Sequence, residues 1–459
     1  MDERSADFVQ VFRAFLDEVV QAQRATRRPD EAGLASVLRI HLGVDPGRLP
    51  VVTEEIPAYL FVDLDVALDE IQQRSARHEL VGIGGGQQRR HHSLSEILEI
   101  DERFSQFPVA AVDYRSIATG PDDARQVVSF GLRLFRFDQA PVAVLQREAD
   151  PRSSNAALME ILTSADGVAA RLISAVRALM LRRSVFRGQV LSLGGSPFEA
   201  GVGGISFHRR PDLAPEDLVL PAGVLDRVRR HIEGVARHRD RLLAAGQHLK
   251  RGLLLHGPPG TGKTHTVRYL LGALPDLTVV LLAGPSIRFV TEAAQLARAL
   301  QPALVVLEDC DLVAEDRDLH SGAQPLLFEV LEALDGLSDD ADVAFLLTTN
   351  RVDVLEPALA QRPGRVDLAV EVPLPDEPAR RRLIALYARS LSFRPATLDR
   401  VAGKAVGTTA SFAKELVRRA VLIAADAGRD CTDTDLDLAV AEMLSEAQAL
   451  TRTLLGANA

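Results

Sequence analysis

The chain has few cysteines and no long uncharged apolar run, and both absences limit the class of protein. Its 459 residues include two cysteines, Cys310 and Cys431, so no disulfide framework is indicated and a reducing environment fits better. No stretch reaches the ~18 apolar residues that a membrane-spanning helix needs. The N-terminal stretch MDERSADFVQ is charged and lacks the apolar core of a signal peptide. We therefore expect a cytoplasmic protein without a transmembrane segment.

A long basic block is also missing, and the formal net charge is −10. This charge balance does not favour nucleic acid or an anionic membrane as a general partner, although it leaves a local basic pore open. Apolar residues make up 47% and charged residues 25% of the chain, as in ordinary globular proteins. At ~100–200 residues per domain, the length predicts two to four domains.

The first ~190 residues have the mixed pattern of an α+β domain, with helices first. Phe8, Phe12 and Phe15 recur at helical spacing within residues 5–24, which predicts an amphipathic helix there. Further helices are expected over about 32–42, 60–71 and 166–183, and strands over 127–137, 141–148, about 158–162 and 185–193. We assign residues 1–193 to an N-terminal α+β domain that binds a substrate or adaptor, and the glycine-rich stretch 194–215 to a linker.

Beyond the linker, apolar strand-like runs alternate with helical segments. Near-continuous apolar strands separated by helices indicate a parallel sheet covered on both faces. From about residue 376 the pattern is helical only. The fold expected is therefore α/β over 216–375, with a parallel sheet between helices, followed by a small helical domain over 376–459. The four runs are RGLLLHG (251–257), LTVVLLAG (277–284), ALVVLED (303–309) and VAFLLTTN (343–350).

A phosphate-binding loop is predicted directly after the first of these runs. The segment GPPGTGKT (257–264) matches the G-x-x-x-x-G-K-[ST] pattern of P-loop nucleotide hydrolases. Its glycines let backbone N–H groups turn toward phosphate oxygens, and Lys263 places a cation on them. The Thr264 hydroxyl is the expected Mg²⁺ ligand. The residues expected to contact the nucleotide here are Gly257, Pro258, Pro259, Gly260, Thr261, Gly262, Lys263, Thr264 and His265.

Two carboxylates end the third apolar run, where a nucleotide hydrolase needs them. One orients Mg²⁺, usually through water, and the other orients the attacking water. Counting from the run, Glu308 takes the metal position and Asp309 the water position. Asn350 ends the next run; an Asn at a strand end alone is usually a turn residue, but in the fold that this order of motifs implies it lies between the terminal phosphate and that water. These residues predict ATP and Mg²⁺ as cofactors.

The stretch TNRVDVLEPALAQRPGRVDLAVEVPLPDEPAR (349–380) closely resembles the second homology region of the AAA proteins proper. That group of AAA+ ATPases includes the membrane protease FtsH, the proteasomal ATPases and the segregases. The resemblance runs from about residue 219 to 445, roughly half the chain. The order of the two acids differs from that of the family: the family has Asp before Glu, whereas this chain has Glu308 before Asp309.

The resemblance implies further residues and a partner. In this family two arginines, here Arg362 and Arg365, reach into the neighbouring subunit's nucleotide site. The chain would therefore form a ring-shaped homo-oligomer, most often a hexamer. The resemblance also places Gly407, Ala410 and Ser411 of a lid segment near the nucleotide. EDLVLPAG (216–223) would pack near adenine, although it lacks the family's Asp-Ile-Gly.

Family members that thread polypeptides carry an aromatic pore loop after the second strand. The equivalent here makes Arg288, Phe289 and Val290 candidates for pore contact, with Phe289 as a plain core residue the competing interpretation. No HExxH motif occurs, so proteolysis in cis is not expected.

The function expected is thus that of a chaperone-like ATPase that remodels a protein client by hydrolysing ATP at subunit interfaces. One alternative is a nucleotide-gated scaffold, in which the inverted acids make hydrolysis slow or absent. A nucleic-acid motor is a further alternative that the acidic charge disfavours.

Overall fold

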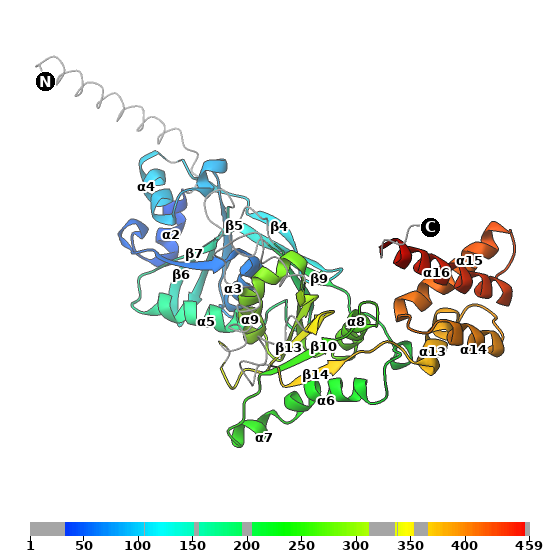
Figure 1. Ribbon diagram of the computed structural model, residues 1–459. Coiled ribbons are helices and arrows are strands. Elements are labelled where there is room, and N and C mark those ends of the chain that lie inside the picture. Colours follow the sequence, from blue (N-terminus) through cyan, green and yellow to red (C-terminus); the bar gives the residue numbers. More distant parts are fainter. Residues whose placement is uncertain are drawn as a thin grey trace, which may run out of the picture. The chain divides into compact units, whose positions relative to one another are not determined.

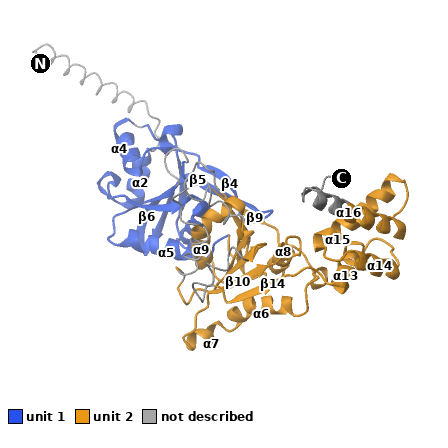
Figure 2. Ribbon diagram, in the orientation of Figure 1, with its two compact units in different colours: residues 1–185 blue, residues 186–459 orange. Residues whose placement is uncertain are grey.

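A computed structural model describes residues 33–104, 106–150, 156–194, 204–311, 336, 338–352 and 366–454, with side chains to residue 445 (Figure 1). The chain divides into two compact units, residues 1–185 and 186–459 (Figure 2). The predicted helix at 5–24 and the arginines Arg362 and Arg365 lie outside the described residues.

Unit 1 is built on an antiparallel seven-stranded sheet. The strand order is β1-β7-β6-β5-β2-β3, with β4 paired to β5. The long strand β5 is the centre of the sheet because it pairs with β6, β2 and β4. The strands are β1 (Val52–Pro57), β2 (Glu79–Ile83), β3 (Val109–Ala110), β4 (Asp113–Ala118), β5 (Ala124–Phe137), β6 (Ala140–Arg147) and β7 (Ala156–Thr163).

Helices cover both faces of this sheet, which confirms the α+β class predicted for the first unit. Alternate residues of β5 face opposite ways. Phe130, Leu132 and Leu134 pack in one core with α2 and α4, whereas Arg133 points to α3, where it binds Asp65. The helices are α2 (Leu34–Leu42), which ends at Gly43 with φ 74°, α3 (Phe61–Gln73), α4 (Leu94–Phe104) and α5 (Val168–Arg182). Short 3₁₀ turns are η1 (Pro46–Arg48), η2 (Ala58–Leu60) and η3 (Gln87–Arg90).

Unit 2 contains the predicted parallel sheet. Strands β10 to β14 are mutually parallel and lie in the order β14-β10-β13-β12-β11. The nearly continuous burial of β12 and β13 shows that both faces of the sheet are covered. This explains why the strands are continuous apolar runs. The strands are β10 (Arg251–His256), β11 (Thr278–Ala283), β12 (Ala303–Glu308), β13 (Val343–Thr349) and β14 (Leu368–Glu371).

Two further strands extend this sheet, and the expected domain boundary is wrong as a result. Strand β8 (Val190–Gly194) pairs with β11 in parallel, and β9 (Gly204–His208) pairs with β8 antiparallel. The sequence placed β8 in the N-terminal domain and β9 in the linker. An apolar run indicates that a strand forms but not which sheet the strand joins. Because β8 joins the sheet of unit 2, the compact units divide after Val185 instead of after residue 193.

The helices of unit 2 fall into two groups. Those around the sheet are α6 (Val224–Arg237), α7 (Arg239–Ala244), α8 (Lys263–Ala273) and α9 (Val290–Ala299), with the 3₁₀ turns η4 (Pro215–Asp217) and η5 (Gly284–Phe289). The last four helices pack around a separate hydrophobic core, as the all-helical pattern predicted. These lid helices are α13 (Glu377–Tyr387), α14 (Pro395–Lys404), α15 (Ala410–Asp426) and α16 (Asp433–Leu454). Within the described parts, no helix is long and apolar enough to cross a membrane.

Candidate functional site

The glycine-rich loop joins the end of β10 to the start of α8, and its conformation requires glycine at three positions. Gly257, Gly260 and Gly262 have φ of 141°, 73° and 112°, which L side chains rarely adopt. A Cβ on Gly257 would also lie 2.2 Å from the carbonyl oxygen of Val372. Because α8 begins at Lys263, its free N-terminal N–H groups and the positive end of its dipole face the space enclosed by this loop. The loop therefore has the geometry of an anion site.

Lys263 is held inside the loop. It is 5% exposed, and its Nζ donates to the carbonyl oxygens of Gly257 at 2.8 Å and Pro258 at 2.9 Å. Burial lowers the pKa of Lys263 below its ordinary value, and the carboxylates of Asp309 and Asp311 oppose that shift. The ammonium is thus fixed where it can turn from the loop carbonyls to phosphate oxygens.

Thr264 and Glu308 are brought together, as expected of residues that hold Mg²⁺. Burial raises the pKa of Glu308, and so does the neighbouring charge of Asp309, whereas a hydrogen bond from the Thr264 side chain opposes the rise. A hydroxyl and a carboxylate are hard oxygen ligands of the kind that Mg²⁺ prefers, with phosphates and water completing its shell. In the described ranges, no cluster of three or more His, Cys, Asp or Glu side chains is arranged to hold a metal ion.

Asp309 and Asn350 end neighbouring strands and face each other. Asp309 has φ 54°, a left-handed conformation that is uncommon for a residue other than glycine, and its N–H donates to Thr348 Oγ1 at 3.0 Å. The Asn350 Nδ2 lies 3.5 Å from Asp309 Oδ1. The structure thus places the two residues expected to handle the attacking water next to each other.

A third carboxylate, Asp311, belongs to this cluster, and the sequence analysis missed it. Its Oδ1 accepts hydrogen bonds from Thr349 Oγ1 at 3.0 Å and from the Asn350 N–H at 3.1 Å, and its Oδ2 lies 3.4 Å from Asn350 Nδ2. Burial alone would raise the pKa of Asp311, but these hydrogen bonds hold it below its ordinary value. The signal was present as a third acid within LEDCD, at the end of the same apolar run.

Several of these groups line a cavity of about 440 Å³ at the carboxyl ends of the strands. That edge is where ligands bind in open parallel sheets. Ten of the expected site residues line it: Pro259, Gly260, Gly262, Lys263, Thr264, His265, Asp309, Asn350, Ala410 and Ser411. Arg268, Tyr387 and Lys414 line it too and were not predicted, while Gly257, Pro258, Glu308 and Gly407 do not line it.

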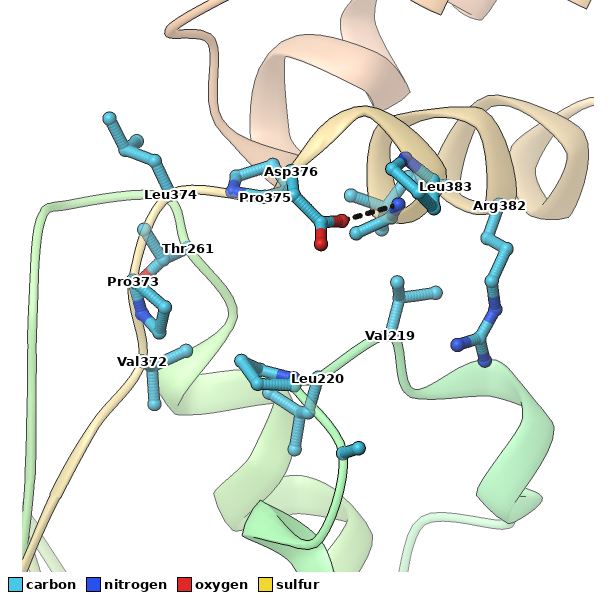
Figure 3. Close-up of a pocket in the computed structure, with 14 residues that line it drawn as sticks. Val219, Leu220, Thr261, Val372, Pro373, Leu374, Pro375, Asp376, Arg382 and Leu383 are labelled. Carbon is cyan, nitrogen blue, oxygen red and sulfur yellow. Dashed lines mark hydrogen bonds between the residues drawn. The ribbon is translucent and has the colours of Figure 1, made fainter.

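A second cavity, of about 270 Å³, also adjoins the phosphate loop (Figure 3). Thr261 lines this cavity, whereas its neighbours Gly260 and Gly262 line the first. Figure 3 shows Val219 and Leu220 facing Pro375 and Asp376 across it. Its other lining residues are Pro221, Ala222, Val372, Pro373, Leu374, Pro378, Ala379, Arg382 and Leu383. Most of its lining side chains are apolar, and they include residues 219–222 of the segment 216–223 that was expected near adenine.

The lid meets the phosphate loop through Ser411. Its N–H donates to the Gly260 carbonyl at 3.1 Å, and Thr409 caps α15 by accepting from the Phe412 N–H at 3.2 Å. The predicted lid residues Ala410 and Ser411 therefore lie at the cavity, while Gly407 supplies the turn before them with φ 74°.

The loop after β11 does not offer an aromatic side chain to a pore. Phe289 is 5% exposed and Val290 is fully buried, so both belong to the protein core. Only Arg288 of the three candidates is exposed, and its guanidinium lies 4.6 Å from the Phe289 ring centroid. The pore-contact interpretation of Phe289 is therefore wrong for this conformation, and the competing core interpretation holds.

Comparison with known proteins agrees with the site. The model of the AAA family, described as the ATPase family associated with various cellular activities, matches residues 253–374. The chain is 35% identical over 169 residues to the 26S protease regulatory subunit 6A of Caenorhabditis elegans, which is 34% of this chain and 39% of that protein. It is 31% identical over 231 residues to the 26S proteasome regulatory subunit 8 homolog of Schizosaccharomyces pombe, 47% of this chain and 57% of that protein.

A third relative is the ATP-dependent zinc metalloprotease FtsH 3 of Sphaerobacter thermophilus. It is 32% identical over 265 residues, 54% of this chain and 53% of that protein. The chain thus spans 39% to 57% of the length of these relatives. The family match and the geometry of the phosphate loop together identify residues 253–374 as an ATPase domain of the AAA family, as the motifs predicted.

Proposed function

We propose that the chain binds MgATP in unit 2, hydrolyses it, and uses the reaction to remodel a protein client. The observation that carries this proposal is the convergence of Lys263, Asp309 and Asn350 on one cavity at the carboxyl edge of a parallel sheet. A cation for phosphates, a carboxylate for water and an amide beside it are the parts that phosphoryl transfer to water requires.

The two cavities divide the nucleotide between them. The larger one carries the cations and would take the phosphates, and the smaller, mostly apolar one would take the adenine. The phosphate loop lies between them and touches both, through Thr261 on one side and Gly262 on the other. This arrangement supports a nucleotide over a free phosphate ion as the ligand.

In the proposed reaction Lys263 holds the β- and γ-phosphates while Asp309 orients the attacking water as its proton acceptor. Asn350 donates to that water or to the γ-phosphate and so keeps the two aligned. Thr264 and, through water, Glu308 would hold Mg²⁺, which supplies neutralisation of phosphate charge. Preorganised groups of this kind act mainly by positioning and electrostatics.

The reversed order of Glu308 and Asp309 supports the alternative function, a nucleotide-gated scaffold with slow or no hydrolysis. Asp309 is one methylene shorter than the Glu that the family has at this position, so its carboxylate would reach less far toward the attacking water. Its left-handed backbone is fixed by the hydrogen bond to Thr348. Slow hydrolysis with tight binding would favour a nucleotide-gated scaffold over a motor.

Assembly and client binding complete the proposal. Arg362 and Arg365 would enter the neighbouring subunit's site in a ring, most often of six, and unit 1 would bind the client or an adaptor. We propose a cytoplasmic setting. Because Phe289 is buried, we assign remodelling to movement of the lid helices against the sheet and not to an aromatic pore contact.

The direct test is nucleotide binding by Lys263→Ala. Isothermal titration calorimetry of the full chain with MgATPγS should give binding in the parent and a loss of at least about 100-fold in the variant, because a charged hydrogen-bond donor to phosphate is removed from a buried site. Lys404→Ala is the matched control, since Lys404 lies on α14 and pairs with Asp437 away from the cavity. Equal affinity in the parent and Lys263→Ala would contradict the proposed site.

A further inference from the structure

The smaller cavity, beside the phosphate loop, has apolar walls and few polar groups. Of the 14 described residues that line it, only Thr261, Asp376 and Arg382 have polar side chains. The proton of the Thr261 hydroxyl is already used, because this hydroxyl donates to the Pro258 carbonyl at 2.9 Å. Asp376 and Arg382 therefore remain as the charged side chains that a ligand in this cavity would meet.

The backbone offers few hydrogen-bond donors to this cavity. Four of its lining residues are prolines, which have no N–H: Pro221, Pro373, Pro375 and Pro378. The N–H of Val372 donates to the His256 carbonyl at 2.7 Å, and the N–H of Ala379 donates to Asp376 Oδ1 at 2.9 Å. A ligand in this cavity would therefore be recognised through side chains more than through the backbone.

Asp376 stands just before α13 and keeps one carboxylate oxygen for a ligand. Its Oδ1 caps the helix by accepting from the Ala379 N–H. Among the described residues its Oδ2 has no hydrogen bond or ion pair, and Figure 3 shows the carboxylate pointing into the cavity. Because an ionised carboxylate can only accept hydrogen bonds, Asp376 favours a ligand that presents an N–H donor at this point.

Arg382 lies at the edge of the same cavity, and its guanidinium has no protein partner (Figure 3). Within the part of the chain that the structure describes, it makes no hydrogen bond, ion pair or ring contact. The neighbouring Arg381, by contrast, pairs with Asp399. A guanidinium is planar and weakly hydrated, and it stacks on flat π-systems. Arg382 therefore suits a flat heterocycle held between the apolar walls.

We propose that Asp376 and Arg382 select the base of the nucleotide: Asp376 accepts a hydrogen bond from the exocyclic amine of adenine, and Arg382 lies against the ring. This inference rests on the proposed function, because it takes a nucleotide with its phosphates at Lys263 as the ligand. Adenine presents an N–H₂ donor where guanine and hypoxanthine present a carbonyl oxygen. That oxygen would face the acceptor-only carboxylate of Asp376, so the cavity favours amino-purines over oxo-purines.

The test compares MgADP with MgIDP, whose bases differ at this position, by titration calorimetry of the full chain. The parent should bind MgADP at least about tenfold more tightly, as expected for one hydrogen bond to a charged acceptor. Asp376→Asn should reduce this preference to about threefold or less, because an amide can donate to the oxygen as well as accept from the amine. Asparagine caps a helix as well as aspartate does, so α13 keeps its start.

Arg382→Met should weaken both diphosphates about fivefold and keep their ratio, because a stacked cation acts on either ring. Arg381→Met is the matched control: it removes a positive charge from the adjacent position of α13, outside the cavity, and should leave both affinities within about twofold of the parent.

Equal affinities of the parent for MgADP and MgIDP, or a parent-like preference in Asp376→Asn, would overturn the role of Asp376. Parent-like affinities in Arg382→Met would overturn that of Arg382. If the parent bound neither diphosphate, the proposed function would fail first, and the two failures are therefore distinguishable.

Discussion

Asp311 shows how a single buried side chain can organise the catalytic groups around it. It contacts the backbone and side chain of Asn350 and the hydroxyl of Thr349, while Asn350 in turn approaches Asp309. Local motif reading predicted Lys263, Asp309 and Asn350 because each follows an apolar run directly. It missed Asp311 although this acid lies close to the same apolar run, because its role comes from contacts with Thr349 and Asn350, far away in the sequence. Lys414 lines the cavity but follows no such run.

Asp311→Asn should slow hydrolysis more than it weakens binding. The new amide would place an N–H₂ group where Asp311 now accepts from Asn350, and the misplaced Asn350 would no longer align the water. We expect kcat to fall about tenfold or more, with Kd for MgATPγS changed less than about threefold, because no phosphate contact is removed. Steady-state kinetics and calorimetry on the same preparations measure both quantities. A parent-like kcat would refute the positioning role.

Asp63 in unit 1 provides a pH-dependent contribution to stability. Burial raises its pKa to about 6, against hydrogen bonds from Ser184 and the Val185 N–H. The folded state thus holds a proton that the unfolded state has lost, so stability is highest below the ordinary pKa and falls as pH rises to about 6. A shift of roughly two pKa units corresponds to about 3 kcal/mol.

Asp63→Asn keeps the acceptor oxygen and removes the titration. The free energy of unfolding of the parent, relative to this variant, should therefore decrease between about pH 4 and pH 6 and stay constant above that range. Thermal or urea denaturation of the two full chains across this pH range measures it. A difference that does not change with pH would show that Asp63 does not titrate in this window.

At the scale of elements, the hairpin β8–β9 is the main departure from the predicted organisation. Strands β10 to β13 were predicted correctly because their apolar runs are continuous and separated by helical segments. The glycine-rich composition of 194–204 predicted a linker, but the strands on either side of it are bound into the sheet. The Phe186 and Phe207 rings stack at 5.6 Å, and the Val279 N–H donates to the Gln189 carbonyl at 2.8 Å.

Arg210 fixes this hairpin to the end of the phosphate-loop helix. Its guanidinium donates to the carbonyl oxygens of Leu274 at 3.0 Å, Gly188 at 3.0 Å and Leu277 at 2.6 Å, and also to that of Leu271. Cations are favoured at the carboxyl end of a helix such as α8. Burial lowers the pKa of Arg210, which Asp276 opposes, so its charge is compensated chiefly by these carbonyls.

Arg210→Met should therefore destabilise unit 2 by about 2–4 kcal/mol, since several carbonyls lose a charged donor together. Hydrogen exchange at the Val279 amide should accelerate, because that amide pairs with the segment that Arg210 holds. The exposed Arg227 on α6 provides the control, and Arg227→Met should change stability by less than about 0.5 kcal/mol. Equal stability of the two variants would mean that Arg210 does not fix the hairpin.

At the scale of the whole molecule, we propose a nucleotide site that one subunit does not complete. The cavity in unit 2 holds the phosphate loop, the acids and the lid residues, but the arginines expected at it, Arg362 and Arg365, are assigned to a neighbouring copy. The sequence indicates this only through the family resemblance, because spacing along one chain carries no information about which subunit's site an arginine enters. The number of subunits is likewise an expectation of the family.

The most direct test of the central proposal is the ATP hydrolysis rate per chain as a function of protein concentration, for the parent and for Arg365→Ala. Shared sites predict a rate per chain that rises with concentration in the parent and falls about 10³-fold or more in the variant, by analogy with arginine fingers in other nucleotide hydrolases. A low rate that is independent of concentration and unchanged in Arg365→Ala would contradict hydrolysis at subunit interfaces and favour the nucleotide-gated scaffold.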